Sequence, residues 1–285
     1  MDFMQLFTAA LFGIVEGITE WLPVSSTGHM ILLNEFVSLN VSEEFYSMFE
    51  VVIQLGAIMA VVVLFWGQIF PFGRKNNLSP LKQTGILSYV KKDIFILWFK
   101  ILAACIPAAV IGLLFNDEIE ALFYNYKTVA VALIVFGIAF IAVESVNGHR
   151  KTKVAALADI TFTYAFFIGV FQLIAAVFPG TSRSGATIVG ALLLGVSRTV
   201  AAEFTFFLAI PVMFGASLLK LVKFGFHFTG AELAVLAVGM IVAFVVSILV
   251  IKFLMDYIKK HNFKIFGWYR IALGLIVLFY FGILA

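Results

Sequence analysis

Charged residues are scarce in this 285-residue chain: 12% are Asp, Glu, Lys or Arg, whereas 63% are apolar. A soluble globular protein has about a quarter charged and about half apolar residues. The mean hydropathy of +1.10 points the same way. This composition excludes an ordinary soluble domain and predicts an integral membrane protein that crosses the bilayer several times.

Cysteine is almost absent as well. The single cysteine, Cys105, excludes a disulfide framework and a thiolate metal site, and we interpret it as a packing residue in an apolar run. The formal net charge of +3 comes without a dense basic block, so nothing favours a nucleic-acid partner. The N-terminus lacks the basic stretch and the small-residue cleavage pattern of a signal peptide, and we expect no cleavage there.

The chain is rich in long apolar runs. A helix needs about 20 mainly apolar residues to cross a membrane, and six runs meet this length: 46–67, 93–115, 125–147, 200–222, 231–255 and 267–284. The segments 3–39 and 159–195 are too long for one crossing, and each is interrupted by proline, hydroxyl and glycine residues. We interpret each as a re-entrant helix hairpin, because non-helical backbone at membrane depth needs protein or a water-filled cavity around it.

Loop charges predict the orientation. Basic residues gather in three loops and at Arg198: Arg74, Lys75, Lys82, Lys91 and Lys92, then Arg150, Lys151 and Lys153, then Lys259, Lys260 and Lys264. The intervening loops carry Glu43, Glu44, Asp117, Glu118 and Glu120. By the positive-inside rule the basic loops are cytoplasmic and both termini are extracytoplasmic. The first hairpin would then enter from outside and the second from the cytoplasm.

The two hairpins are similar in sequence. "GIVEGITEWLPVSSTG" (13–28) aligns without a gap with "GVFQLIAAVFPGTSRS" (169–184), which places Glu16 over Gln172 and Ser26 over Ser182. Each half of this single transmembrane domain, approximately 1–148 and 159–285, holds one hairpin and three crossings, so the copies would be inverted. Inverted repeats with broken helices place their polar site near the midplane, at the repeat interface. Chance similarity between two apolar segments is the alternative.

The first hairpin carries two carboxylates, Glu16 and Glu20, at positions i and i+4 of one helix face. A charged residue within the membrane costs about 2.5–3.5 kcal/mol on insertion scales, so such residues usually face a cavity or pathway. Oxygen ligands of this kind suit Mg²⁺ or Ca²⁺, especially beside a phosphate. The alternative is that both glutamates extend to the outer interface.

Three hydroxyls and a histidine follow Pro23. Ser25, Ser26 and Thr27 stand where a second helix would begin, and hydroxyls there can simply cap the helix. His29, however, follows Ser26 at i+3 on the same helical face. A hydroxyl near an imidazole and carboxylates is the arrangement that activates a nucleophile.

The second hairpin carries "PGTSRSG" (179–185). Its glycines let backbone approach a ligand, the following helix directs its N-terminus at the loop, and Arg183 offers a bidentate guanidinium. These features predict an anion site suited to phosphate. Arg183 could alternatively form a buried ion pair with Glu16 or Glu20 that orients the two halves.

Four motifs resemble the bacterial undecaprenyl-diphosphate phosphatase family of the bacitracin-resistance type: "GIVEGITEWLPVSSTGHM", "FEVVIQLGAIMAVVV", "PGTSRSGATI" and "AAEFTFFLAIP". The resemblance runs nearly end to end. It implies a plasma-membrane hydrolase that removes the terminal phosphate of undecaprenyl diphosphate on the outer side, which recycles the carrier lipid for peptidoglycan synthesis and confers bacitracin resistance. The family's functional positions fall on Glu16, Glu20, Ser26, Thr27, His29, Ser182 and Arg183.

We therefore expect three groups of site residues. Those assigned to catalysis are Ser26, His29, Glu20 and Arg183. Those assigned to substrate binding are Ser25, Thr27, Gly28, Gly180, Thr181, Ser182 and Ser184, and a divalent cation would be held by Glu16 and Glu20. We expect Ser26 to attack with help from His29, although His29 as the nucleophile, or direct attack by water, stays open.

A phosphatase of the acid-phosphatase type is excluded, because no second histidine follows Ser182-Arg183 in "SGATIVGALLLGVSRT". A lipid flippase or secondary transporter is the alternative from a different class, since opposed broken helices also occur in carriers. The cluster of nucleophile, base and arginine favours the enzyme. The sequence leaves open which cation is used, which polyprenyl lengths are accepted and whether the protein forms a homodimer.

Overall fold

The computed structural model describes residues 3–73, 77, 79–148 and 150–284, and these residues are almost entirely helical. Arg74 and Lys75, which we assigned to a basic loop, lie outside the described residues. Six described helices are long and apolar enough to cross a membrane: Glu43–Leu64, Lys92–Phe115, Tyr126–Asn147, Arg198–Phe224, Gly230–Lys260 and Lys264–Ile283. They confirm the six predicted crossings.

These crossings correspond to α3 (Glu43–Leu64), α5 (Lys92–Phe123), α6 (Tyr126–Asn147), α9 (Arg198–Phe224), α10 (Gly230–Lys260) and α11 (Lys264–Phe279). Side chains of Ser42, Asn125, Ser197 and Thr229 accept backbone N–H bonds at the starts of α3, α6, α9 and α10, as short polar caps do. The helix α5 kinks at Phe115 and continues through 116–123. The predicted outer loop at Asp117–Glu120 is therefore wrong, because these residues form a helical extension beyond the kink.

Four shorter helices form two pairs: α1 (Phe3–Thr19) with α2 (Ser26–Phe36), and α7 (Phe162–Val177) with α8 (Arg183–Leu193). The remaining short elements are α4 (Trp66–Ile69), η1 (Ile86–Tyr89), η2 (Leu157–Asp159) and the terminal turn η3 (Tyr280–Leu284). Both pairs break where the sequence places proline next to hydroxyl residues. The helices α1 and α7 have 17 and 16 residues, which is short of the roughly 20 residues that a crossing needs.

Glycines let each pair approach a long helix closely. A Cβ on Gly13 would lie 2.6 Å from the carbonyl oxygen of Gly239 in α10, and a Cβ on Gly169 would clash with the carbonyl of Ala104 in α5. Close approach of backbones at small residues is the usual way for membrane helices to pack. Helices α6 and α11 also pack closely at glycines, because a Cβ on Gly137 would lie 2.7 Å from the Gly267 oxygen.

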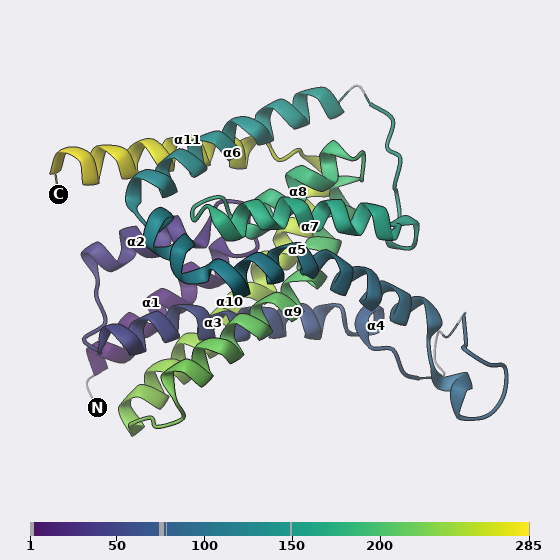
Figure 1. Ribbon diagram of the computed structural model, residues 1–285, viewed down its shortest axis with the longest axis horizontal. Helices are drawn as coiled ribbons and strands as arrows, with labels where there is room; N and C mark the ends of the chain where they lie inside the picture. The colour runs from purple at the N-terminus through teal and green to yellow at the C-terminus, as the bar shows by residue number, and fades with distance from the viewer. Residues whose placement is uncertain (1–2, 74–76, 78, 149, 285) are drawn as a thin grey trace.

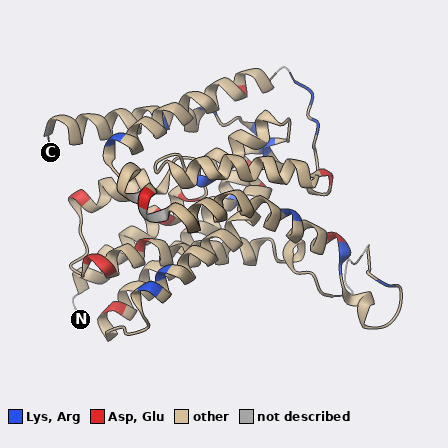
Figure 2. Ribbon diagram, in the orientation of Figure 1, with Lys and Arg blue, Asp and Glu red and all other residues tan. Residues whose placement is uncertain are grey.

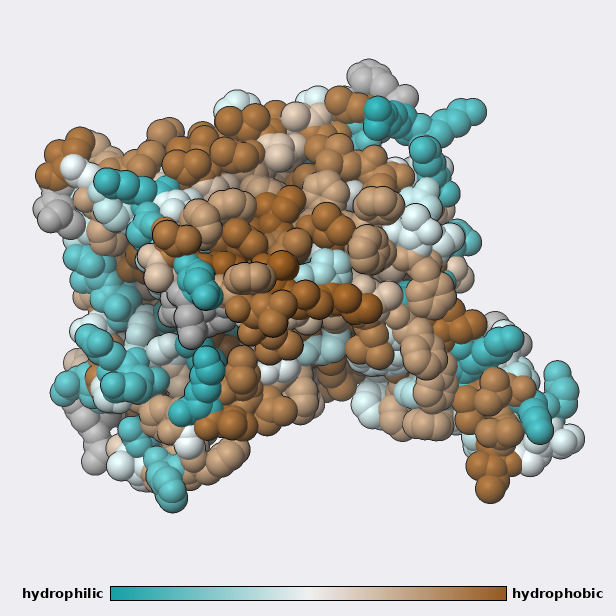
Figure 3. Space-filling view, in the orientation of Figure 1, coloured by the Kyte–Doolittle hydropathy of each residue, from teal (hydrophilic) through white to brown (hydrophobic). Residues whose placement is uncertain are grey.

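Both termini lie at the same end of the molecule (Figure 1). Most of the basic residues lie toward the opposite end, in and near the connections α4–α5 and α6–α7 (Figure 2). The space-filling view shows an apolar belt across the middle with hydrophilic residues gathered toward both ends (Figure 3). This distribution is what a bilayer requires, because its hydrocarbon core cannot solvate charge.

Candidate active site

The two helix breaks have the same unusual backbone geometry. Ser25 and Ser182 cap α2 and α8 with φ angles of 76° and 68°, and among the described residues they are the two non-glycine positions with positive φ. Each hydroxyl accepts a bond from the amide three residues on, that of Gly28 at 3.4 Å and that of Gly185 at 3.1 Å. Such sparsely populated conformations cost about 1–3 kcal/mol and cluster at functional sites.

The caps change the register of the sequence alignment at the breaks. The gap-free alignment placed Ser26 over Ser182, but the residue with the cap geometry of Ser182 is Ser25. Ser182 lies one residue further from the aligned Gly169 than Ser25 lies from Gly13, so the second hairpin holds one extra residue before its cap. Helix capping, which the sequence left open for the three hydroxyls, is therefore a role of Ser25, and the neighbouring Ser26 hydroxyl is left for another partner.

That partner is Glu20, which joins the two breaks. The Ser26 hydroxyl donates to Glu20 Oε2 at 3.1 Å, and Arg183 Nη2 donates to Glu20 Oε1 at 2.8 Å. Ser184 Oγ donates to the backbone oxygen of Glu20 at 3.1 Å, and also lies 3.1 Å from Ser182 Oγ. Glu20 is 7% exposed. The structure thus gathers Ser26 and Arg183 on a single buried carboxylate.

Arg183 is held on several sides. Its Nη1 donates to the carbonyl of Thr205 in α9 at 3.1 Å, and Nη2 lies 3.9 Å from Met213 Sδ. Its Nε is buried and has no hydrogen-bond partner among the described residues, so one donor stays available for an anion. The ion pair between Arg183 and a first-hairpin glutamate, which the sequence offered as an alternative to phosphate binding, is present with Glu20.

Both ring nitrogens of His29 have partners other than Glu20, Ser26 and Arg183. Its Nδ1 lies 2.7 Å from the carbonyl oxygen of Ser25, and its Nε2 lies 2.7 Å from the hydroxyl of Tyr269 in α11. The two rings stack with an interplanar angle of 4°. Among the described residues no hydrogen bond joins His29 to Ser26, so the expected serine–histidine contact is replaced by a serine–glutamate contact.

The proposed cation ligands, Glu16 and Glu20, lie on one helix face and provide two carboxylate groups. Glu16 is 1% exposed, and its Oε1 has no hydrogen-bond partner. No described group of three or more His, Cys, Asp or Glu side chains forms a metal site. Two carboxylates still fit Mg²⁺, which is usually bound by one or two carboxylates together with substrate phosphates and water.

Arg270, which is absent from the predicted site residues, joins the two breaks. It is fully buried in α11, and its guanidinium donates to the carbonyls of Pro23 at 3.3 Å, Gly180 at 2.9 Å and Thr181 at 2.7 Å. Arginine inside a predicted crossing was the available signal, because intramembrane charges mark functional positions. These three carbonyl oxygens therefore accept their hydrogen bonds from Arg270.

Glycines at the breaks have structural contacts as well. Gly180 has a φ of 90°, and a Cβ there would collide with the backbone of Val129 in α6. A Cβ on Gly28 would lie 3.2 Å from Leu133. The close approach at Gly180 is thus to another helix, and a role of Gly28 and Gly180 in substrate binding stays a prediction.

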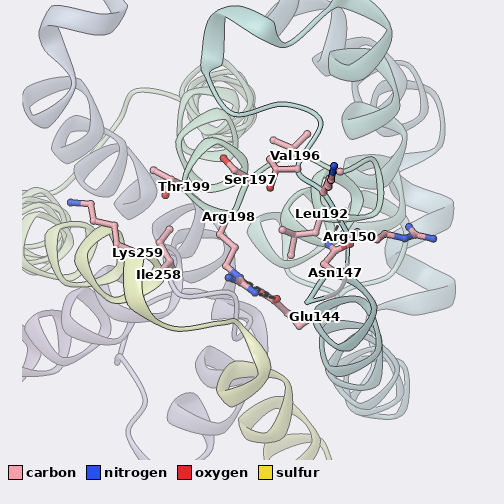
Figure 4. A pocket seen from close by; sticks show the side chains of 13 residues that line it. Glu144, Asn147, Arg150, Leu192, Val196, Ser197, Arg198, Thr199, Ile258 and Lys259 are labelled. Atoms are coloured by element: carbon pink, nitrogen blue, oxygen red, sulfur yellow. Dashed lines mark hydrogen bonds and ion pairs between the residues drawn. The ribbon is translucent and has the colours of Figure 1, made fainter.

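A cavity of about 610 Å³ adjoins the breaks. Thr27 and Pro179 of the two breaks line it, together with residues of α2, α3, α7, α9, the end of α5 and the terminal turn η3. A second pocket of about 230 Å³ lies at the basic end and is crossed by Arg198, which donates to the buried Glu144 at 2.6 Å. Arg150 and Lys259 point away from that pair (Figure 4). Because Arg198 is neutralised by Glu144, we interpret the second pocket as structural.

Comparison with known proteins gives a uniform result. The family described as "Bacitracin resistance protein BacA" matches residues 9–276. The undecaprenyl-diphosphatase of Desulfitobacterium hafniense is 64% identical over 99% of this chain and 98% of its own length. Undecaprenyl-diphosphatase 1 of Clostridium acetobutylicum is 60% identical over 99% of both chains, and the undecaprenyl-diphosphatase of Enterococcus faecalis is 57% identical over 98% of both.

Proposed function

Because this chain belongs to the BacA family of bacitracin resistance proteins, we propose that it is an undecaprenyl-diphosphatase. It hydrolyses undecaprenyl diphosphate to undecaprenyl phosphate and phosphate at the outer side of the bacterial plasma membrane, and so recycles the carrier lipid for peptidoglycan synthesis. The observation that carries this function in the structure is the contact of Glu20 with both Ser26 and Arg183. A nucleophile, a carboxylate and a guanidinium within hydrogen-bond reach suit phosphoryl transfer.

The proposed architecture is an inverted repeat with two re-entrant hairpins. It is supported by the matching glycine contacts of α1 with α10 and of α7 with α5, and by the twin serine caps. It is also supported by the location of both termini at the end opposite most of the basic residues. With the basic loops in the cytoplasm, both termini would lie outside and the large cavity would be reached from the outer side.

Charge neutralisation is the main task of a phosphoryl-transfer site. Arg183 would bind the terminal phosphate through Nε and one terminal nitrogen, and Ser182 and Ser184 would add hydroxyl donors. Glu16 and Glu20 would hold a divalent cation, Mg²⁺ or Ca²⁺, which supplies Lewis-acid neutralisation of the phosphate oxygens when bound. The buried, unpartnered oxygen of Glu16 supports this assignment.

Ser26 would attack the terminal phosphorus, and Glu20 would take its proton. The Ser26 hydroxyl already donates to Glu20 Oε2 at 3.1 Å, which places this carboxylate to accept the proton. The bond from the terminal phosphorus to the bridging oxygen breaks, undecaprenyl phosphate leaves, and water then cleaves the phosphoserine. His29 as the nucleophile would give a phosphohistidine instead.

The deciding experiment measures phosphate release from undecaprenyl diphosphate by the purified protein in detergent, with and without a chelator. We expect activity that Arg183→Ala and Ser26→Ala abolish and that the chelator removes. Trapping the intermediate separates the nucleophiles, since a phosphoramidate is acid-labile and a phosphoserine is acid-stable. The same sample gives the particle mass, which distinguishes a monomer from a homodimer.

A lipid carrier is the second candidate, favoured by the paired short helices that lie against long ones. It would move lipid between leaflets without cleaving the diphosphate. Full transport of the lipid, together with undecaprenyl diphosphate that stays uncleaved in the detergent assay, would favour the carrier over the phosphatase.

A further inference from the structure

The large cavity contains a basic residue that the proposed chemistry does not use. Lys220 of α9 lines the cavity, and it is the sole lysine or arginine among the described residues that do so. The same lining includes two carboxylates, Glu35 of α2 and Glu50 of α3. A cation in the wall of a water-accessible cavity within the membrane is a functional candidate by its position alone.

Lys220 has a neutral partner. Its Nζ donates to the hydroxyl of Ser47 in α3 at 2.8 Å. None of the ion pairs among the described residues includes Lys220. Glu50 instead accepts the hydroxyl of Tyr46 at 2.8 Å. An ammonium group has three donors, so Lys220 can keep Ser47 and still bind an anion.

The distance from the reaction centre can be followed along α9. Met213 contacts Arg183, and Lys220 follows Met213 by two helical turns, i to i+7, on the same face of the helix. At 1.5 Å per residue this places Lys220 about 10 Å further toward the outer end. A diphosphate bound at Arg183 would not reach so far, but an anion leaving the site would pass it.

We propose that Lys220 and Ser47 form a second anion subsite, which receives the inorganic phosphate released at Arg183 on its way out through the cavity. This inference rests on the proposed phosphatase function for the origin of the phosphate. Lys220 lowers the electrostatic barrier that Glu35 and Glu50 would otherwise present to a dianion. The two carboxylates keep the subsite weak, which suits a position that must empty after each turnover.

Two measurements test the subsite, and Lys223→Gln is the matched control for both. Lys223 lies on the same helix one turn further on, is exposed and does not line the cavity, so its loss changes the net charge equally. The first measurement is equilibrium dialysis of radiolabelled inorganic phosphate with the purified protein in an Arg183→Ala background, without lipid. The second is inhibition of undecaprenyl phosphate formation by added phosphate, followed by chromatography of the lipid.

We expect Lys220→Gln to weaken phosphate binding by about tenfold or more, the size of one charge-assisted hydrogen bond. The inhibition constant for phosphate should rise similarly, whereas Lys220→Arg and Lys223→Gln should behave like the parent. Equal phosphate binding by Lys220→Gln and Lys223→Gln would overturn the subsite. Lys220-dependent binding in a protein that releases no phosphate from lipid would instead overturn the proposed function and leave the subsite standing.

Discussion

Glu20 and Arg183 form a 2.8 Å ion pair across the two helix breaks, although 163 residues separate them in the sequence. Glu20 also accepts the Ser26 hydroxyl. One buried carboxylate therefore sets the distance between the proposed nucleophile of one half and the proposed phosphate ligand of the other. The position of each of these three side chains should therefore depend on the positions of the other two.

Arginine cannot be replaced by lysine at position 183. Arg183→Lys keeps the charge but loses the fork that contacts Glu20 and Thr205 together. We expect kcat for phosphate release to fall by about 100-fold or more, as when a single charge-stabilising donor is removed. Arg150→Lys, at an exposed position, is the control and should retain full activity. Retention of activity by Arg183→Lys would assign Arg183 to orientation of the halves only.

Replacement of Ser26 should affect turnover, whereas replacement of the neighbouring Ser25 should affect stability. Ser26→Ala should reduce turnover by about a thousandfold or more, because a nucleophile has no substitute. Ser25→Ala should lower stability by about 1 kcal/mol through the lost cap, whereas Ser25→Gly should restore most of it because glycine accepts positive φ. Phosphate release and thermal unfolding in detergent measure the two effects. A stable, inactive Ser25→Gly together with an active Ser26→Ala would reverse the assignment.

Several features were predictable because they depend on composition or local pattern. The six crossings follow from apolar length, and the breaks follow from proline beside hydroxyl residues. The loop predicted at Asp117–Glu120 is wrong for a local reason: acidic residues between two apolar runs favour a loop, but the helix continues beyond its kink at Phe115. The one-residue register shift at Ser25 could not be read from an alignment, since it depends on which serine adopts positive φ.

Contacts between distant residues were harder to predict. The partner of His29 is Tyr269, 240 residues away, and nothing in the sequence near either residue indicates the other. Arg270 and Glu144 were missed although each is an ionisable residue inside an apolar run. The rule that such residues mark important positions was applied to Glu16 and Glu20 but applies equally to these two.

Arg270 should govern stability more than any exposed arginine. Its replacement by methionine leaves three buried carbonyls without their donor. Each hydrogen bond to a charged group is worth about 1.5–3 kcal/mol, so we expect loss of about 3 kcal/mol or more, seen as a lower unfolding temperature in detergent. Arg270→Lys should be intermediate because lysine reaches fewer of the carbonyls. An unchanged unfolding temperature in both variants would show that the breaks are held by other contacts.

The hydrogen bond from Tyr269 to His29 offers a way to assess the histidine without removing it. Tyr269→Phe deletes one hydroxyl and keeps the stacked ring. If His29 is the nucleophile, loss of this orienting hydrogen bond should lower kcat about tenfold with little change in KM, because a misplaced reacting group slows the chemical step. If Ser26 attacks and Glu20 takes its proton, kcat should stay unchanged. Tyr280→Phe, which loses only a long contact of 3.4 Å to Glu35, is the control. Full activity of Tyr269→Phe would place His29 outside the reaction.

The proposed orientation can be measured with single cysteines. In a Cys105→Ala background, Glu43→Cys marks the predicted outer end and Lys82→Cys marks the predicted cytoplasmic loop, and both positions are exposed. A membrane-impermeant maleimide should label position 43 in intact cells and position 82 only after permeabilisation. The opposite pattern would put the large cavity, and with it phosphate release, on the cytoplasmic side. Because the charge distribution that predicts the orientation is independent of the site geometry, that result would leave the contacts of Glu20 intact and change only the leaflet from which the lipid is taken.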